Sequence, residues 1–247
     1  MPKAEVAKAP ITVVSTYTID VLLNERGEHL EVDEAGPARF ISNALEGEDL
    51  PFSLIAGKPM TVEILVTANG EFGKIPDRSP RQRIPALVSD WVILSTVLNE
   101  WDMFSIKKWP AHLFVDLQGF VRNGSNFGQK QQWDEIGLFD SKIFCLKGTR
   151  EEFEYIPKCV LEQQKQRMMV ITDGSESIEL FYRGRPFRIP VQRMIGLKNT
   201  IGAGDTLIAC LVAAMYKGNN PVEAVLHSSK MTARFLEENK VVGGFVV

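Results

Sequence analysis

The sequence predicts an α/β fold in which a mostly parallel sheet is flanked by helices. Short runs rich in β-branched residues, such as ITVVS at residues 11–15 and MMVIT at residues 168–172, have the length and composition of buried strands. Segments with apolar residues at helical spacing alternate with such runs, and two long helical segments follow the last of them. We expect one domain over residues 1–247, because a chain of 247 residues can bury one such core.

A first helix is predicted after the strand at residues 11–15. Residues 33–37 (DEAGP) indicate a loop that leads into it, and Pro37 suits the first helical position. The apolar stripe of this helix is formed by Phe40, Ile41, Ala44 and Leu45. A short strand at residues 52–55 is expected to follow.

The middle of the chain predicts a β-hairpin and two further buried strands. Residues 61–67 and 72–75, which flank an Asn-Gly turn, have the pattern of the hairpin. The two buried strands are predicted at residues 91–95 (WVILS) and 113–116 (LFVD), and each run ends in a polar residue. Residues 119–132 form a long polar segment that is either an active-site loop or a surface connection.

The C-terminal half predicts a regular alternation of elements. In chain order these are a strand at residues 142–146, a helix that Thr149 caps and Arg150 begins, a strand at residues 168–172, a hairpin of residues 178–182 and 186–190, and helices at residues 205–216 and 221–238. Ligands of such folds bind at the C-terminal ends of the parallel strands. We therefore expect the functional site at that edge of the sheet.

Composition and charge narrow the class of protein. The net charge of −3 argues against a general nucleic-acid binder, which needs a basic face. The three cysteines and three histidines are scattered without metal-ligand spacing. Residues 1–10 lack the apolar core of a signal peptide, and the longest apolar run, residues 207–216, is too short to span a bilayer. We expect a cytoplasmic protein that is not bound to a membrane.

The segment NTIGAGDT at residues 199–206 carries the clearest chemical signal. The small residues Gly202, Ala203 and Gly204 allow close approach of a ligand to the backbone, and they begin an apolar helix whose free amides favour an anion. Asp205 places a carboxylate beside that anion site. A base that takes the proton of an attacking hydroxyl group accounts for such a placement, and an ordinary loop with a helix-capping aspartate is the alternative.

This segment resembles the C-terminal signature of the ribokinase-like (PfkB) carbohydrate kinases. Further segments resemble the family's motifs in the family's order. They are YTID at residues 17–20, AGPA at residues 35–38, VDLQG at residues 115–119, KGTREE at residues 147–152 and VITDG at residues 170–174. The resemblance covers nearly the whole chain, and the Gly-Ala-Gly-Asp element is its most specific part.

The resemblance implies a Rossmann-like, mostly parallel sheet flanked by helices, with a β lid beside the site. Few residues separate Gly36 from Thr61, where other members carry an additional strand, a helix and lid elements. We therefore expect a reduced lid, formed by the hairpin at residues 61–75. The lid often forms the dimer in this family, so the reduced lid leaves the oligomeric state open, with a homodimer as one alternative.

The activity implied is that of an ATP-dependent kinase which phosphorylates a hydroxyl group of a sugar or polyol, such as a cyclitol. Asp205 would accept the hydroxyl proton, while the amides of Gly202, Ala203 and Gly204 stabilise charge on the transferring group. Substrate would be bound by Asp20, Gly36, Gln118 and Arg122. ATP would be bound by Lys147, Thr172, Gly174, Asn199 and Thr200, and Mg²⁺ would be organised by Glu152.

Several positions depart from the family pattern and keep alternatives open. Asn199 replaces the usual aspartate, Phe40 lies where the family often has asparagine, and Thr149 replaces the asparagine that accompanies Glu152. A nucleoside kinase and a catalytically idle ligand-binding member of the fold are the alternatives. A dinucleotide-binding enzyme is disfavoured, because no glycine follows the first strand at residues 15–18.

Overall fold

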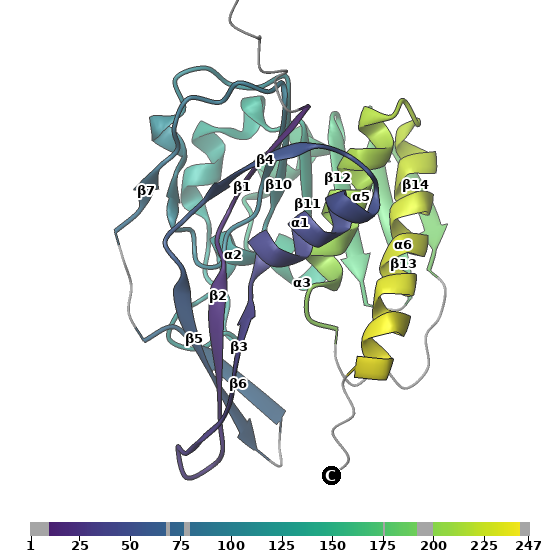
Figure 1. Cartoon of the computed structure of the whole chain (residues 1–247). Coiled ribbons are helices and arrows are strands. Elements are labelled where there is room, and N and C mark those ends of the chain that lie inside the picture. The colour runs from purple at the N-terminus through teal and green to yellow at the C-terminus, as the bar shows by residue number, and fades with distance from the viewer. Residues whose placement is uncertain (1–9, 68–69, 77–79, 175, 192–199, 243–247) are drawn as a thin grey trace, which may run out of the picture.

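The main sheet of the protein has eight strands in the order β14-β13-β12-β11-β10-β8-β1-β4 (Figure 1). The computed structural model describes residues 10–67, 70–76, 80–174, 176–191 and 200–242. The strands are β1 (Ile11–Ser15), β4 (Phe52–Ala56), β8 (Trp91–Leu94), β10 (His112–Asp116), β11 (Cys145–Thr149), β12 (Met168–Asp173), β13 (Ser177–Tyr182) and β14 (Arg185–Pro190). All neighbours are parallel except β13, which pairs antiparallel with both β12 and β14. The predicted mostly parallel sheet is confirmed.

Helices cover both faces of the main sheet (Figure 1). One face packs against α1 (Pro37–Gly47), α5 (Ala203–Tyr216) and α6 (Pro221–Val242). The other packs against α2 (Gln118–Val121), α3 (Arg150–Phe153), α4 (Lys158–Lys165) and the 3₁₀ turns Met103–Ser105, Asp134–Leu138 and Asp140–Lys142. Successive strand residues alternate between the two cores: Val13 joins the first and Val14 the second. Helix α5 is buried from Asp205 to Ala214, which explains its nearly uniform apolar sequence.

A second sheet of four strands, in the order β3-β2-β5-β6, extends from one end of the main sheet (Figure 1). Its strands are β2 (Thr18–Leu23), β3 (His29–Ala35), β5 (Met60–Thr67) and β6 (Gly70–Lys74). It contains the predicted hairpin, β5 and β6, and is broader than that hairpin because β2 and β3 belong to it as well. A third pairing joins β7 (Gln82–Arg83) to β9 (Trp101–Asp102).

Two local predictions are wrong. The loop predicted from residue 33 is strand up to Ala35, and only Gly36 separates β3 from α1. Strand β3 is largely exposed and therefore carries charged residues. In the sequence alone, such residues are typical of a loop. The strand predicted from Lys142 begins at Cys145 instead, where pairing with Phe114 of β10 starts. Ile143 is buried in the core without belonging to the strand. Pro37 is the first residue of α1, as predicted.

The polar segment at residues 119–132 begins in α2 and then runs along the second sheet. The amide of Phe127 donates to the carbonyl of Gly73 at 2.9 Å, and the amide of Ile75 donates to the carbonyl of Gly124 at 2.8 Å. The segment is therefore joined to β6 at the edge of the second sheet. Within the described part of the chain, no helix has both the length and the apolar character needed to cross a membrane.

Candidate active site

A cavity of about 790 Å³ lies where the C-terminal ends of the parallel strands meet the second sheet and the start of α5. Its walls include Thr96 after β8, Gln118 after β10, Lys147 of β11 and Thr172 of β12. This is the edge of the sheet at which α/β folds bind ligands. All predicted site residues within the described part of the chain line this one cavity, and Asn199 lies outside the described residues.

The first turn of α5 forms one wall of the cavity. Gly202 precedes the helix with φ of 80°, a left-handed conformation that favours glycine. A Cβ atom there would also lie 2.4 Å from the ring of Phe40. Ala203, Gly204 and Asp205 follow in the first turn, whose amides have no partner within the helix and whose dipole favours negative charge. The amide of Ala203 donates to the carbonyl of Thr200 at 3.1 Å, outside the helix. The start of α5 thus combines small residues with a helix N-terminus, and anion binding by GAGD stays a prediction.

Asp205 is buried in this wall, only 7% exposed. The hydroxyl of Ser95, the residue after β8, donates to its Oδ1 at 3.2 Å. Burial, together with the nearby Asp116 carboxylate, raises the pKa of Asp205 to about 7, although Lys147, Ser95 and Arg122 act in the opposite direction. A carboxyl group with a pKa near neutrality has the property required of a general base. Sequence reasoning missed Ser95, although a polar residue directly after an apolar strand was the available signal.

A buried ion pair lies beneath the first turn of α5. Lys147 Nζ is 2.8 Å from Asp116 Oδ2, and the two side chains are 5% and 0% exposed. Burial alone would lower the pKa of Lys147, but the Asp116 and Glu152 carboxylates outweigh it and raise that pKa, so the ammonium is charged. A Cβ atom on Gly204 would lie 2.6 Å from Nζ. Gly204 is therefore small enough to admit this ammonium next to the anion site.

Glu152 has a structural role besides the magnesium-organising role predicted for it. It completes a capping box with Thr149: its Oε2 accepts from the amide of Thr149 at 2.8 Å, and its own amide donates to Oγ1 of Thr149 at 3.2 Å. The Glu152 side chain is buried and also lines the cavity. Among the described residues, no three His, Cys, Asp or Glu side chains are grouped as a metal site.

Asp20 and Gly36 lie on the side of the cavity formed by the second sheet. Asp20 projects from β2, and its Oδ1 is buried with no hydrogen-bond partner among the described residues. Burial raises the pKa of Asp20, assisted by Asp33 and opposed by Thr18 and Arg122. Gly36, with φ of 90°, has the backbone of Thr18 where a Cβ would lie. An unpaired buried carboxylate oxygen is costly, so it marks a place where a ligand hydroxyl group can donate.

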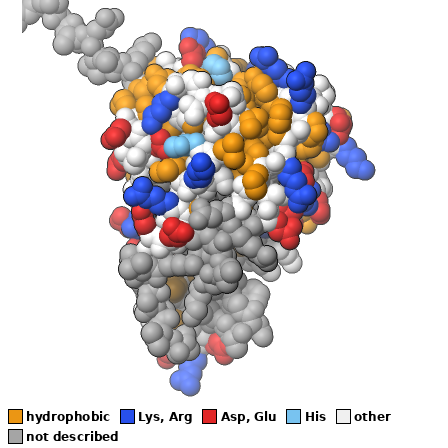
Figure 2. Space-filling model, turned by 90° about the vertical axis from the view of Figure 1, so that its right-hand side faces the viewer, with side chains coloured by type: hydrophobic (Ala, Val, Ile, Leu, Met, Phe, Trp, Pro, Cys, Tyr) orange, Lys and Arg blue, Asp and Glu red, His pale blue; other side chains and the backbone are white. Residues whose placement is uncertain are grey.

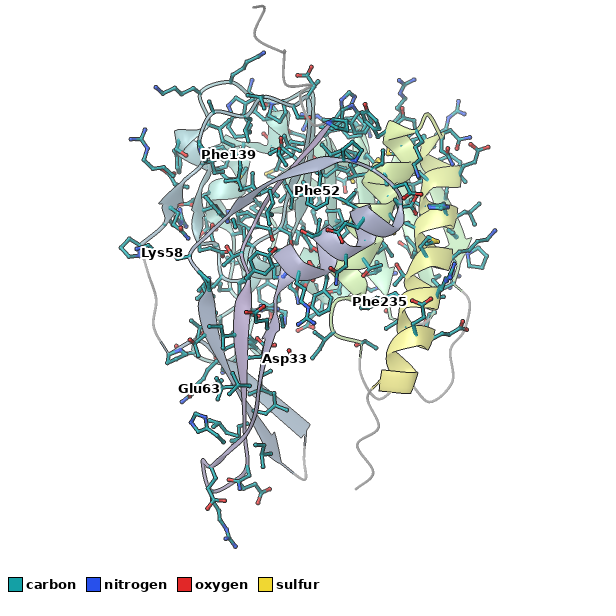
Figure 3. All side chains as sticks on the ribbon, in the orientation of Figure 1. Asp33, Phe52, Lys58, Glu63, Phe139 and Phe235 are labelled. Carbon is teal, nitrogen blue, oxygen red and sulfur yellow. The ribbon has the colours of Figure 1, made fainter. Side chains whose placement is uncertain are left out.

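The lining that comes from β12, β13, α5 and α6 mixes apolar and polar side chains. The polar residues and glycine are Thr172, Gly174, Thr200, Ser229 and Thr232, and the apolar side chains include Ile178, Val191, Leu207, Ala233 and Leu236. Phe40 of α1 lines the cavity, and its ring meets the ring of Phe235 edge to face, with the ring centres 6.0 Å apart. Phe235, labelled in Figure 3, belongs to α6. The cavity thus has a polar end, formed by Asp20, Arg122, Lys147, Glu152 and Asp205, and a mainly apolar end next to α6, which also contains Ser229 and Thr232.

Comparison with solved structures identifies the fold. A nucleoside kinase of the ribokinase family from Methanocaldococcus jannaschii superposes with a TM-score of 0.75 at 12% identity, over 93% of this chain and 92% of its own. A pyrophosphate-dependent kinase of the ribokinase family, complexed with a pyrophosphate analogue and myo-inositol, gives 0.68 at 16% identity over 92% and 95%. Ribokinase from Arabidopsis thaliana, complexed with ribose and ATP, gives 0.67 at 12% identity over 93% and 99%.

No protein-family model and no curated protein matches the chain. The structural similarity extends over nearly the whole length of each protein compared. The protein therefore has the ribokinase-like fold, as the sequence predicted.

Proposed function

We propose that this protein is a kinase that transfers the γ-phosphoryl group of ATP to a hydroxyl group of a neutral sugar or polyol. The observation that carries the proposal is the placement of Asp205, a buried carboxyl group with a pKa of about 7 at the amide-rich start of α5. A carboxylate beside an anion site is unfavourable for binding alone. Its benefit arises when it removes a proton from a hydroxyl group that attacks a phosphoryl group.

The chemistry follows from this arrangement. Asp205 accepts the proton of the acceptor hydroxyl while the oxygen of that hydroxyl bonds to the γ-phosphorus. The bond between the γ-phosphorus and the oxygen that bridges it to the β-phosphate breaks, and ADP leaves. The amides at Gly202, Ala203 and Gly204 and the Lys147 ammonium stabilise the negative charge that moves through this region. Asp20 accepts a hydrogen bond from a hydroxyl group of the substrate, which relieves its unpaired oxygen.

Mg²⁺ fits the charge balance of the cavity. Among the described residues, its lining contains three carboxylates, Asp20, Glu152 and Asp205, and two cations, Arg122 and Lys147. A polyphosphate entering such a site needs further positive charge, which Mg²⁺ supplies. Because the described residues form no cluster of three ligands, we propose that Glu152 contributes through water and that phosphate oxygens provide most of the coordination.

The apolar end of the cavity favours ATP as the donor. Ile178, Leu207 and Leu236 line a region that an adenine ring would fill. Pyrophosphate is the second candidate, since one structure with this fold is a pyrophosphate-dependent kinase. Pyrophosphate would leave this apolar region in contact with water.

A substrate panel tests the proposal. Turnover of ATP and of pyrophosphate is measured with Mg²⁺ against sugars, cyclitols and nucleosides. We expect at least one neutral sugar or polyol to raise ATP turnover about tenfold or more above the acceptor-free rate. A nucleoside as the best acceptor would favour the nucleoside-kinase alternative. ATP binding without any acceptor-dependent turnover would contradict the proposal and favour a catalytically idle binding protein.

The pH dependence of turnover is expected to follow the ionisation of Asp205. Only the ionised carboxylate can accept a proton, and its pKa is raised to about 7. At saturating MgATP, kcat/KM for the acceptor should therefore rise about tenfold per pH unit below about pH 7 and level off above it. ATP binding measured at the same pH values serves as the control for ionisation of the nucleotide. A flat or falling profile through pH 7 would contradict the assignment of Asp205 as the base.

We further propose a cytoplasmic protein that acts on a small molecule and not on nucleic acid. Cys145, Cys159 and Cys210 are free thiols, which fits a reducing compartment. On the face that carries α6 and β14, positive and negative side chains are interspersed with hydrophobic ones (Figure 2). A homodimer is proposed through the outer part of the second sheet, where Leu30 and Val32 are 58% and 60% exposed. Light scattering of the purified protein tests the dimer.

A further inference from the structure

The segment after α2 connects the polar end of the cavity to the second sheet. Its first residue, Arg122, lines the cavity, and Phe127, five positions later, both lines the cavity and donates its amide to the carbonyl of Gly73 in β6 at 2.9 Å. The Phe127 ring packs with Met60 and Val62 of β5 in a small core of the second sheet. A side chain of the cavity and the position of the second sheet are therefore coupled through a few residues.

The guanidinium group of Arg122 is held by two contacts. Nη1 donates to the carbonyl of Val97 at 3.1 Å, and Cζ lies 4.3 Å from the centre of the Phe127 ring. The first contact ties Arg122 to the main sheet side of the cavity. The second ties it to a ring that packs against the second sheet. A planar cation over an aromatic face has its N–H groups directed outward around the ring edge.

Gly73 fixes the ring on the side of the second sheet. A Cβ atom on Gly73 would lie 2.5 Å from Cδ2 of Phe127, so the ring occupies the space that any other residue of β6 would need. Gly73 is not among the described glycines with a positive φ. The lack of space for a side chain therefore explains why glycine occupies this position, and the backbone conformation does not. The ring can stay in place only while β6 presents a glycine there.

Arg122 acts on the groups that the proposed reaction uses. The carboxylates that interact with it come from every element around the polar end of the cavity: Asp20 of β2, Glu100, Asp116 of β10, Glu152 of α3 and Asp205 of α5. Its charge lowers the pKa of both Asp20 and Asp205. The position of the guanidinium group therefore affects the residue proposed to hold the acceptor and the residue proposed as its base.

We propose that Phe127 is a positioning residue whose ring, fixed by the second sheet, orients the guanidinium group of Arg122 to donate to oxygen atoms of the acceptor. The inference rests on the proposed kinase function and deepens it. An ionised Asp20 only accepts hydrogen bonds and Arg122 only donates them. The pair thus selects an acceptor with neighbouring oxygen atoms, one donating to Asp20 and one accepting from Arg122, as in a neutral vicinal diol.

Phe127→Leu tests the inference, with Phe127→Tyr as the matched control. Leucine keeps an apolar side chain in the core of the second sheet but removes the aromatic face, whereas tyrosine keeps it. We expect Phe127→Leu to raise the KM of the acceptor about tenfold, with the KM of ATP within about twofold of wild type. Phe127→Tyr should stay within about threefold of wild type for both substrates. A thermal melt of each variant confirms that it is folded.

A double-mutant cycle separates positioning from a general structural effect. In an Arg122→Lys background the planar cation is absent, so Phe127→Leu should raise the KM of the acceptor by less than about twofold further. Should Phe127→Leu not fold, Gly73→Ala displaces the ring from the other side and is expected to raise the same KM. An unchanged acceptor KM in Phe127→Leu, or effects that multiply in the double variant, would overturn the inference while leaving the kinase function intact. No acceptor-dependent turnover in the wild type would overturn both.

Discussion

Replacing Asp205 with asparagine is expected to lower kcat by about 10²- to 10⁴-fold while leaving the binding of ATP nearly unchanged. Asparagine has almost the same shape and can still accept from the hydroxyl of Ser95, but it cannot take up a proton. The pKa of Asp205 is raised to about 7, so ionisation of this group disfavours the folded state at pH values above its unfolded pKa. The variant should therefore be at least as stable as the wild type at pH 8, which separates lost chemistry from lost folding.

Ser95→Ala is the matched control for this experiment. It removes the hydrogen bond to Oδ1 of Asp205 and keeps the carboxylate, so we expect a much smaller loss of kcat, about tenfold or less. Calorimetric titration with ATP and a denaturation curve are measured for both variants. An Asp205→Asn protein that keeps more than about a tenth of the wild-type kcat would show that another group is the base.

Replacing Lys147 with methionine is expected to destabilise the protein by about 3–5 kcal/mol. The substitution leaves the carboxylate of Asp116, which is 0% exposed, buried without its cation. It also removes the ammonium that lies next to Gly204 at the anion site, so kcat should fall as well. The measurement is the free energy of unfolding by urea, with the slope m checked against the wild type.

The double variant Asp116→Asn/Lys147→Met tells why stability is lost. Asparagine removes the unpaired charge and can still accept the hydrogen bond from the amide of Gln118. We expect the double variant to regain most of the lost stability without regaining turnover. Removing one partner leaves a buried charge unpaired, whereas replacing both partners by neutral residues changes the free energy of unfolding little. If the single variant lost less than about 1 kcal/mol, the ion pair would not have the buried character that the structure gives it.

The central strands of the main sheet could be predicted because they are buried on both faces. Such strands read as continuous apolar runs, and the predicted first strand has the bounds of β1, Ile11–Ser15. Strands β2 and β3 were not predicted, because they belong to a sheet that is partly exposed. The consecutive charged residues of β3, such as Asp33 and Glu34, are typical of loops when read in sequence alone. Strand β2 pairs with β5, which lies far along the chain, and β3 pairs with β2.

The site shows the same division between local and distant information. The segment from Gly202 to Asp205 could be singled out because its features are neighbours in sequence: small residues, a helix start and a carboxylate. The partners that tune it are distant. Ser95 donates to Asp205 from 110 positions away along the chain, and Asp116 pairs with Lys147 from 31 positions away. Phe127 depends on Gly73 in another sheet, so its role could not be predicted from the polar segment that contains it.

Transfer of a phosphoryl group to an acceptor hydroxyl in this cavity can be followed by ³¹P NMR of the protein with ATP, Mg²⁺ and the acceptor that most raises turnover in the substrate panel. We expect ADP and a phosphate monoester of the acceptor in equal amounts, with no product formed by Asp205→Asn. ADP together with inorganic phosphate only, or no consumption of ATP with any acceptor, would rule out the proposed kinase reaction.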